Sequence, residues 1–474
     1  MAQTILGRQE EKRELERLYQ SERPEFVAVY GRRRVGKTFL VRELFDRRLC
    51  FYHTGLSPSE LDEGQLKEQQ LREFHRSLIA WGGHPTSVPT DWFEAFDALR
   101  QLVSSRPRGQ RKVLFIDEMP WMDTPRSGFV TALEHFWNGW AAGQAQVMLI
   151  VCGSATSWMA NNLINNYGGL YNRLTAEIHL RPFTLAECEA YYKANSLVFD
   201  RYDQIQSYMV FGGVPYYLSL LQKGKSLAQN IDLLFFADNA KLRNEFTRLY
   251  RSLFRNADDC MTVIRLLAGR REGYTRKEIA EATKLPYGGG LTATLRSLEE
   301  SDLIVSYIPY QASQRQTTYR LTDFFSIFHL TFLDRHRTSN AHFWTDNVGG
   351  QQLTAWRGFS FEGVCFAHID KIKQALGISG VQTEVSAWHS DEAQIDMIID
   401  RQDRVVNLCE IKFCTDTFSI DRSYDAVLRR KQSCLEAMNG KHKSIHLTMM
   451  TTYGIVQNEY SGRVQAQLTM DDLF

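Results

Sequence analysis

The sequence has no excess of charge of either sign: its 474 residues include 56 lysines and arginines against 55 aspartates and glutamates. A near-neutral total excludes a protein that is basic all over, so any nucleic-acid or membrane contact must come from a local patch. Long apolar runs are also missing, because Val147–Cys152 is far too short to cross a bilayer. The first residues are too charged for a secretory signal. We therefore expect a cytoplasmic protein without a membrane segment.

Paired cysteines are missing as well. The eight cysteines are scattered without a CxxC pair, and no zinc-type ligand spacing is present. This pattern indicates free thiols in a reducing compartment. The chain also lacks low-complexity tracts and internal repeats. Its length is too great for one hydrophobic core, so several domains are expected.

The first part of the chain alternates strand-like apolar runs with amphipathic helical segments. This alternation predicts an α/β fold built on a parallel sheet, and the distance between the strands leaves room for the crossovers that parallel neighbours need. The expected helices are Glu11–Tyr19 and Lys37–Phe45, and the expected strands are Phe26–Tyr30, Val113–Ile116 and Gln146–Cys152.

A phosphate-binding loop follows the first expected strand. Residues Gly31-Arg-Arg-Arg-Val-Gly-Lys-Thr38 fit the pattern GxxxxGK[ST] in full and open the next helix. Glycines let backbone N–H groups close around phosphates, and the helix amino terminus adds positive charge. We expect Lys37 to reach the β- and γ-phosphates of ATP or GTP and Thr38 to ligate Mg²⁺. The predicted nucleotide-binding residues are Gly31, Arg32, Arg33, Arg34, Val35, Gly36, Lys37, Thr38, Phe39 and Ser154.

An acidic pair, Asp117 and Glu118, follows the strand Val113–Ile116, at the edge where open α/β sheets bind ligands. Asp117 is expected to hold Mg²⁺ through water, and Glu118 to activate or orient the attacking water. Ser154 either contacts the γ-phosphate or the water, or is a polar turn residue. Arg173 either stabilises transition-state charge, within the chain or from a neighbouring subunit, or forms a surface salt bridge.

The pattern becomes helical from about Thr184, which opens a capping box with Glu187. A small unit then has the spacing of a winged helix-turn-helix. Its expected helices are Thr275–Ala282 and Leu291–Glu300, its expected strands are Leu303–Ile308 and Thr317–Leu321, and a buried helix Phe324–Phe332 follows. The presumed recognition helix carries Glu299 and Glu300, which disfavour phosphate contact, so a structural role is an equal alternative.

The last part of the chain carries a second acidic group, Asp396 followed by Glu410 and Lys412. Glu410 and Lys412 share one face of a strand because strand side chains alternate. With Asp396 they resemble the core of the PD-(D/E)xK nuclease fold, although isoleucine precedes Asp396 where the pattern has proline. The resemblance implies that the two carboxylates bind Mg²⁺ and that Lys412 positions or activates water.

Further residues around this group are expected to assist. Glu362, on an expected helix Phe359–Ile369, would complete the metal shell, and Lys431 and Gln432 occupy positions typical of auxiliary residues. Two alternatives stay open. The charges are ordinary exposed strand residues, or the fold is retained for DNA binding without catalysis.

The first half of the chain resembles the archaeal-type ATPases, AAA-related P-loop proteins of the STAND group. The matching segments are Gly7-Arg8, Tyr30–Thr38, Phe115–Glu118, Cys152–Ser154, Leu180–Phe183, Gly212–Tyr216 and, later, Tyr319–Phe324. The resemblance implies an ATPase core, a helical lid and a winged helix. It also favours ATP over GTP, since no guanine-specifying [NT]KxD sequence is present.

These observations predict four domains: a P-loop ATPase core at 1–182, a helical lid at 183–255, a winged helix-turn-helix with a linker helix at 256–341, and a nuclease-like α/β domain at 342–474. The leading hypothesis is an Mg²⁺-dependent ATPase coupled to a domain that acts on double-stranded DNA, in a chain that forms homo-oligomers. The alternative is a regulatory or scaffolding ATPase that binds DNA or protein without cleavage. A transcription regulator that uses the winged helix is a third reading.

Overall fold

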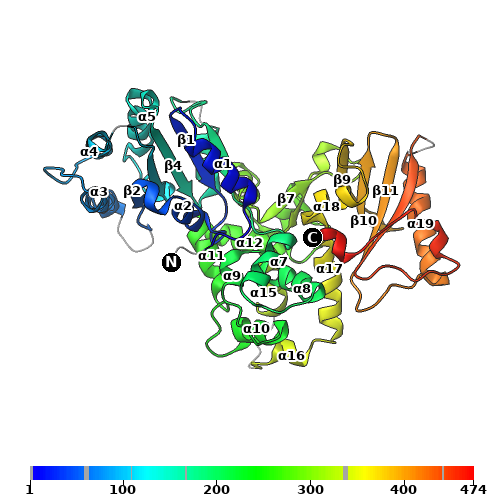
Figure 1. The fold of residues 1–474 in the computed structure, drawn as a ribbon. Coiled ribbons are helices and arrows are strands. Elements are labelled where there is room, and N and C mark those ends of the chain that lie inside the picture. Colours follow the sequence, from blue (N-terminus) through cyan, green and yellow to red (C-terminus); the bar gives the residue numbers. More distant parts are fainter. Residues whose placement is uncertain (1–3, 58–62, 108, 166–167, 335–339, 440–441) are drawn as a thin grey trace. The chain divides into compact units, whose positions relative to one another are not determined.

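The computed structural model describes residues 4–57, 63–107, 109–165, 168–334, 340–439 and 442–474. The chain folds into two compact units (Figure 1). The first consists of Met1–Arg181 with Arg251–Arg255, and the second of Pro182–Tyr250 with Asn256–Phe474. The predicted boundary at 182 lies next to this change of unit. The later boundaries, at 255 and 341, stay predictions because the second unit is compact throughout.

The first unit contains a five-stranded sheet in the order β2-β3-β4-β1-β5. All neighbouring strands are parallel, which confirms the predicted α/β class. The strands are β1 Glu25–Tyr30, β2 Leu49–Thr54, β3 Lys112–Asp117, β4 Val147–Gly153 and β5 Ala176–His179. The sequence did not predict β2 and β5. Both lie at the edges of the sheet, where burial is partial and the apolar pattern is correspondingly weak.

Helices cover both faces of this sheet because successive strand side chains point to opposite sides. Val27 and Val29 pack with α1 and α2, whereas Phe26 and Ala28 pack with α3, α4 and α5. The helices are α1 Gln9–Tyr19, α2 Lys37–Phe45, α3 Glu63–Ala80, α4 Trp92–Ser105, α5 Phe129–Gly139 and the short α6 Thr156–Met159. In Figure 1, α1 lies on one side of β1 and β4, and α5 on the other.

The second unit begins with helices. Thr184 caps the first of them through the predicted box with Glu187. Gly212 ends α8 with φ of 60°, a left-handed conformation that suits glycine at this position. The helix predicted at Phe324–Phe332 is present with the same bounds and is almost entirely buried. The helices are α7 Leu185–Ala194, α8 Arg201–Phe211, α9 Pro215–Leu218, α10 Leu227–Ile231, α11 Glu245–Leu253, α15 Phe324–Phe332 and α16 Phe343–Asp346.

Three further helices pack beside a small antiparallel sheet in the order β6-β8-β7. The helices are α12 Ala257–Leu267, α13 Arg276–Thr283 and α14 Gly289–Glu300, and the strands are β6 Tyr274–Thr275, β7 Ile304–Tyr307 and β8 Thr318–Leu321. The two predicted strands do pair with each other. Helix α14 begins two residues earlier than predicted, with Gly289 and Gly290 in its first turn.

The last part of the second unit is a five-stranded sheet in the order β13-β12-β11-β10-β9. Strands β9 to β11 run antiparallel, and β11 to β13 run parallel. The elements are α17 Gln351–Ala367, α18 Ile369–Ala375, β9 Thr383–His389, β10 Gln394–Arg401, β11 Val405–Lys412, α19 Arg422–Asn439, β12 Ser444–Thr451 and β13 Ala466–Leu468. Helix α17 begins eight residues before the predicted Phe359. The prediction began too late because Gly358, a weak helix former, lies inside the helix.

Helix α19 covers one face of this sheet. Its Leu428 and Leu435 pack against Val406 and Leu408 of β11. None of the described helices is both long enough and apolar enough to cross a membrane.

Candidate functional sites

The loop between β1 and α2 has the backbone of a phosphate cradle. Gly31 has φ of 141° and Gly36 has φ of 93°, both in the region that favours glycine. A Cβ atom on Gly31 would lie 2.3 Å from the carbonyl oxygen of Leu180, so this position has no room for a side chain. The two glycines therefore fix the path of the loop in front of the α2 amino terminus.

Lys37 is buried at the start of α2 and its ammonium group crosses the loop. Its Nζ donates hydrogen bonds to the carbonyl oxygens of Gly31 at 2.8 Å and Arg32 at 2.9 Å. The ammonium is thus held by two neutral acceptors, and no carboxylate of the described residues is among its hydrogen-bond partners. A charged phosphate is a stronger acceptor than either carbonyl. The geometry fits a site for a nucleotide phosphate.

Thr38 and Asp117 bring the two halves of this site together. The Thr38 hydroxyl donates to Asp117 Oδ2 at 2.6 Å, which joins the first turn of α2 to the end of β3. A hydroxyl and a carboxylate side by side are the hard oxygen ligands that Mg²⁺ takes together with substrate phosphates and water. The donor set therefore fits Mg²⁺ at the position that the sequence predicted.

Glu118 follows directly and is held by Ser154. Glu118 has a left-handed backbone, with φ of 46°. Its Oε2 accepts hydrogen bonds from the backbone N–H of Ser154 at 3.1 Å and from the Ser154 hydroxyl at 2.8 Å. Ser154 is buried at the end of β4. In the structure, Ser154 thus orients the predicted water-activating carboxylate.

Arg8 is a site residue whose role sequence reasoning missed. It is buried, and its Nη2 donates to the carbonyl oxygen of Val35 in the loop at 3.2 Å. It also lies 3.6 Å from Glu11. The Gly7-Arg8 pair was noticed only as part of the family resemblance. Its contact joins segments 27 residues apart, and no local pattern reveals such a contact.

Arg173 lies in the segment that leads into β5. It lies exposed in the turn before β5, where the following Thr175 bonds to Phe26 near the amino-terminal end of β1. The phosphate loop begins at the other end of β1. The structure thus places Arg173 before β5, near the end of β1 that lies opposite the phosphate loop. A catalytic role of Arg173, within the chain or from a neighbouring subunit, stays a prediction.

The second acidic group lies in the C-terminal sheet, where β10 and β11 are antiparallel neighbours. Their register pairs Met397 with Cys409, so Asp396 and Glu410 are the next residues along the two strands. Both carboxylates are buried. Asp396 Oδ2 accepts a hydrogen bond from the backbone N–H of Ile411 at 3.1 Å. The structure therefore brings the predicted pair together, on neighbouring strands and away from bulk water.

Glu410 is surrounded by cationic and hydroxyl donors. Lys412 Nζ lies 2.8 Å from Oε1, and Lys431 Nζ of α19 lies 2.5 Å from Oε2. The Tyr424 hydroxyl also donates to Oε1. Burial opposes ionisation of Glu410, but the two lysines outweigh it and lower its pKa. Sequence reasoning placed Lys431 near the site but missed Tyr424, and Gln432 instead bonds to Glu436 at 2.9 Å.

Asp396 faces a different set of charges. Lys412 Nζ lies 4.0 Å from its Oδ2, and Arg271 Nη2 lies 3.7 Å from its Oδ1. Arg271 also forms an ion pair with Glu362 of α17. Burial, and then the negative charge of Glu410, raise the pKa of Asp396. Asp396 and Glu362 thus converge on one cationic group, the Arg271 guanidinium.

The structure does not gather all three predicted metal ligands of this domain into one shell. In the part of the chain that the structure describes, no three His, Cys, Asp or Glu side chains lie together as a metal site. Both oxygens of Glu410 are already bonded to lysines. The pair Asp396 and Glu362 fits a cation, because both carboxylates form ion pairs with the Arg271 guanidinium.

Comparisons with known proteins agree with the geometry of the first unit. Its sheet and loop define a P-loop nucleotide-binding fold. Residues 6–221 match the sequence model of a family described as an ATPase domain predominantly from Archaea, which confirms the predicted resemblance for this part of the chain. The match spans less than half of the chain. Residues 6–221 therefore have the sequence features of an archaeal-type ATPase domain.

Individual proteins that resemble this chain have low sequence identity to it. An uncharacterised protein of Methanocaldococcus jannaschii is 21% identical over 419 residues, which cover 86% of this chain and 87% of that protein. The Walker-type ATPase of Pyrococcus abyssi aligns with 69% of this chain and 96% of its own, at 20% identity and a TM-score of 0.48. The ORC2 protein of Aeropyrum pernix, in ADPNP and ADP complexes, aligns with 70% of this chain and 94% of its own, at 15% identity and a TM-score of 0.41.

Proposed function

We propose that this protein is an Mg²⁺-dependent ATPase whose nucleotide state controls a C-terminal domain that acts on DNA. The observation that carries the first half is the assembly of Lys37, the Thr38–Asp117 pair and Glu118 around one loop. These are the parts that phosphoryl transfer to water requires: a phosphate cradle, a cation, metal-binding oxygens and a carboxylate that orients the water.

Each residue of the first site takes one role in this proposal. Backbone N–H groups of the loop and the amino terminus of α2 bind the phosphates. Lys37 exchanges its carbonyl partners for phosphate oxygens. Thr38 and Asp117 would hold Mg²⁺, which would supply positive charge that neutralises the phosphates. Glu118 accepts a hydrogen bond from the attacking water and receives its proton. Ser154 keeps the Glu118 carboxylate in position through its two hydrogen bonds.

The C-terminal half of the proposal is a PD-(D/E)xK-like nuclease site. It is supported by the convergence of Asp396, Glu410 and Lys412 on neighbouring strands. Asp396 and Glu362 would hold the metal ion, Glu410 would fix Lys412, and Lys412 would position the attacking water. The unit formed by α12, α13, α14 and β6 to β8 is proposed as a winged helix-turn-helix, because three helices pack beside an antiparallel sheet. Residues 183–255 would form the lid.

Two assays test the two halves separately. Phosphate release from ATP, with and without duplex DNA, is expected for the parent, and Lys37→Ala and Glu118→Gln should each lower it at least about 100-fold. Nicking of plasmid DNA in Mg²⁺ or Mn²⁺ is expected for the parent and should be lost in Asp396→Asn and Lys412→Met. ATPase activity should survive these last two changes. Nicking that persists in both would reject the assigned nuclease site.

A second candidate is a regulatory ATPase that binds DNA or protein without cleavage. The ion pairs that occupy both oxygens of Glu410 favour it, since they stabilise a site that is neutralised without metal. This candidate predicts nucleotide-dependent binding that Lys37→Ala removes, and no nicking under any metal condition.

A further inference from the structure

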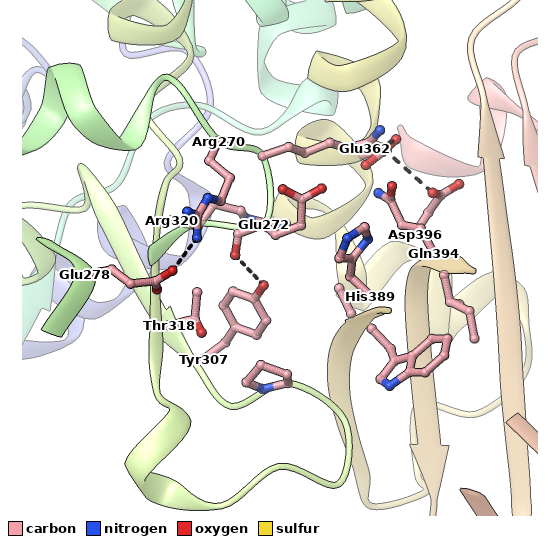
Figure 2. Close-up of a pocket in the computed structure, with 16 residues that line it drawn as sticks. Arg270, Glu272, Glu278, Tyr307, Thr318, Arg320, Glu362, His389, Gln394 and Asp396 are labelled. Atoms are coloured by element: carbon pink, nitrogen blue, oxygen red, sulfur yellow. Dashed lines mark hydrogen bonds and ion pairs between the residues drawn. The ribbon is translucent and has the colours of Figure 1, made fainter. Parts of the chain in front are cut away.

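A cavity of about 180 Å³ lies beside Asp396 in the second unit (Figure 2). It has room for several water molecules. Figure 2 shows Asp396 and Glu362 on one side of this cavity and Tyr307 and Thr318 on another. Three arginines, Arg270, Arg271 and Arg320, also line it. The cavity therefore joins the small antiparallel sheet to the acidic group of the C-terminal sheet.

Arg320 on β8 is the arginine of this cavity whose charge no described carboxylate neutralises. Its guanidinium lies over the rings of Phe366, 4.4 Å from the centroid, and Tyr307, 5.8 Å from the centroid. Among the residues that the structure describes, it has neither an ion pair nor a hydrogen-bond acceptor. Burial lowers the pKa of this guanidinium, and the charge of Arg271 lowers it further. The Arg320 guanidinium is therefore available as a donor to an anion.

The other two arginines differ from Arg320. Arg270 is neutralised by Glu278, at 2.6 Å, and stacks on Tyr274. Arg271 is paired with Asp396 and Glu362, but its buried Nε has no hydrogen-bond acceptor among the described residues. Ion pairs therefore hold the Arg271 guanidinium in place, and its Nε–H can still donate a hydrogen bond to a ligand.

The sign of the whole cavity depends on a metal ion. The three arginines face four carboxylates, those of Glu272, Glu278, Glu362 and Asp396, so negative charge is in excess by one. A divalent cation on Asp396 and Glu362 would reverse this sign and compete with Arg271 for its carboxylates. A phosphate would then meet two guanidinium groups whose planar forks match its oxygens.

We infer that this cavity is a phosphate-binding subsite, in which Arg320 and Arg271 bind a phosphate of the DNA strand next to the one at Asp396, and that a divalent cation switches it on. The inference rests on the proposed DNA-acting function of the C-terminal domain. It adds to that function two substrate-positioning residues that come from outside the C-terminal sheet, one on β8 and one in the turn before β6.

The test uses the full-length protein and a short fluorescein-labelled DNA duplex, with binding followed by anisotropy in Ca²⁺ and in EDTA. Arg320→Met and Arg271→Gln should each weaken binding about 10-fold to 100-fold in Ca²⁺, as expected for the loss of a charge-assisted phosphate contact. Each should also lower the salt slope of binding by about one. In EDTA these differences should disappear. Arg320→Lys should retain part of the affinity.

Arg265→Gln is the matched control, since it removes an arginine of the same unit that pairs with Asp334 outside the cavity. It should bind like the parent. Thermal unfolding separates binding from packing, because Arg320→Met removes an unpaired, partly buried charge and should leave the midpoint temperature unchanged or higher. A lower midpoint with unchanged DNA affinity would assign Arg320 to packing and overturn the subsite.

The remaining outcomes separate this inference from the proposed function. If the parent binds DNA and both arginine variants bind it equally well, the subsite is rejected and the DNA-acting function stands. If the parent binds no DNA, thermal unfolding with inorganic phosphate and Ca²⁺ tests whether the cavity binds phosphate at all. An increase in the unfolding midpoint of the parent, absent in Arg320→Met, would keep the phosphate subsite for a free phosphate or nucleotide and reject DNA as its source. No increase would reject both.

Discussion

Thr38 and Asp117 are 79 residues apart in the sequence, yet the Thr38 hydroxyl donates a 2.6 Å hydrogen bond to the Asp117 carboxylate. The contact runs from the start of α2 to the end of β3, although β4 separates β1 from β3 in the sheet. Hydrogen bonds to a charged acceptor are the stronger kind. This hydrogen bond therefore holds the two oxygens side by side.

Replacement of Thr38 should change the metal requirement of ATP hydrolysis. Thr38→Val keeps the shape of the side chain but removes the hydroxyl, so the Mg²⁺ concentration for half-maximal activity should rise about 10-fold, as for one lost polar contact of about 1.4 kcal/mol. Thr38→Ser should behave like the parent. Magnesium titrations of phosphate release measure this change. Equal half-maximal Mg²⁺ in all three proteins would remove Thr38 from the metal site.

Lys37 should matter for catalysis more than for folding. Its ammonium contacts two loop carbonyls, whereas in the proposed complex it contacts transferring phosphate oxygens. Lys37→Ala should lower kcat for ATP at least about 100-fold, as for loss of one transition-state donor. Lys12→Ala on α1 is the control and should leave turnover unchanged. Circular dichroism should show both variants folded, and turnover within a few-fold of the parent in Lys37→Ala would contradict the assignment.

Both Glu118 and Ser154 should contribute to ATP turnover, and Glu118 should contribute more. Glu118→Gln should retain ATP binding and lose about 10²-fold to 10⁴-fold in turnover, the usual contribution of a general base. Ser154→Ala should lose about 10-fold, because it frees the carboxylate without removing it. Turnover and the binding of a fluorescent ATP analogue should be measured together. If Ser154→Ala instead abolished binding, Ser154 would contact the phosphate itself.

Glu410 should be important for stability whatever the domain does. It is 1% exposed and pairs with Lys412 and Lys431, so Glu410→Gln leaves buried ammonium charge without a counter-ion. Loss of one member of a buried pair costs about 3–5 kcal/mol. Urea unfolding should show this loss, and the double change Glu410→Gln with Lys431→Met should recover much of it. No recovery in the double variant would show that the lysine is not the source of the loss.

His368 should make the second unit sensitive to acid. Its Nε2 accepts a hydrogen bond from the Leu185 N–H at 3.0 Å, and its Nδ1 lies 2.9 Å from the Val364 carbonyl oxygen. Burial lowers the pKa of His368 below its ordinary value of 6.5, so the folded state disfavours the charged ring. The contribution of neutral His368 to the stability of the folded state is complete above its ordinary pKa. This contribution is lost as the pH falls through the lowered pKa of the folded state.

Thermal unfolding between about pH 8 and about pH 5 measures this effect. The midpoint of the parent should fall more steeply with acid than that of His368→Asn, which cannot acquire the charge. His53 and His329 are also buried, with pKa values lowered to about 4, and they are present in both proteins, so the difference isolates His368. Parallel curves would show that His368 does not titrate in this range.

Much of the nucleotide site could be predicted because its signals are local. The loop from Gly31 to Thr38 needs glycine at two left-handed or crowded positions and a helix directly after it, and all of these appear within one short stretch. The alternation of side chains along β11 likewise placed Glu410 and Lys412 on one face. The buried helix Phe324–Phe332 was clear from its aromatic run.

Only the tertiary structure decided which distant residues meet. It placed β4 between β1 and β3, turned Ser154 toward Glu118, and brought Arg271 to Asp396. The physical reason is that periodicity and turn chemistry act over a few residues. Strand order and ion pairs depend instead on how whole faces pack. The sequence by itself therefore determined a phosphate-binding loop with its helix, and the packing of distant segments determined what surrounds each carboxylate.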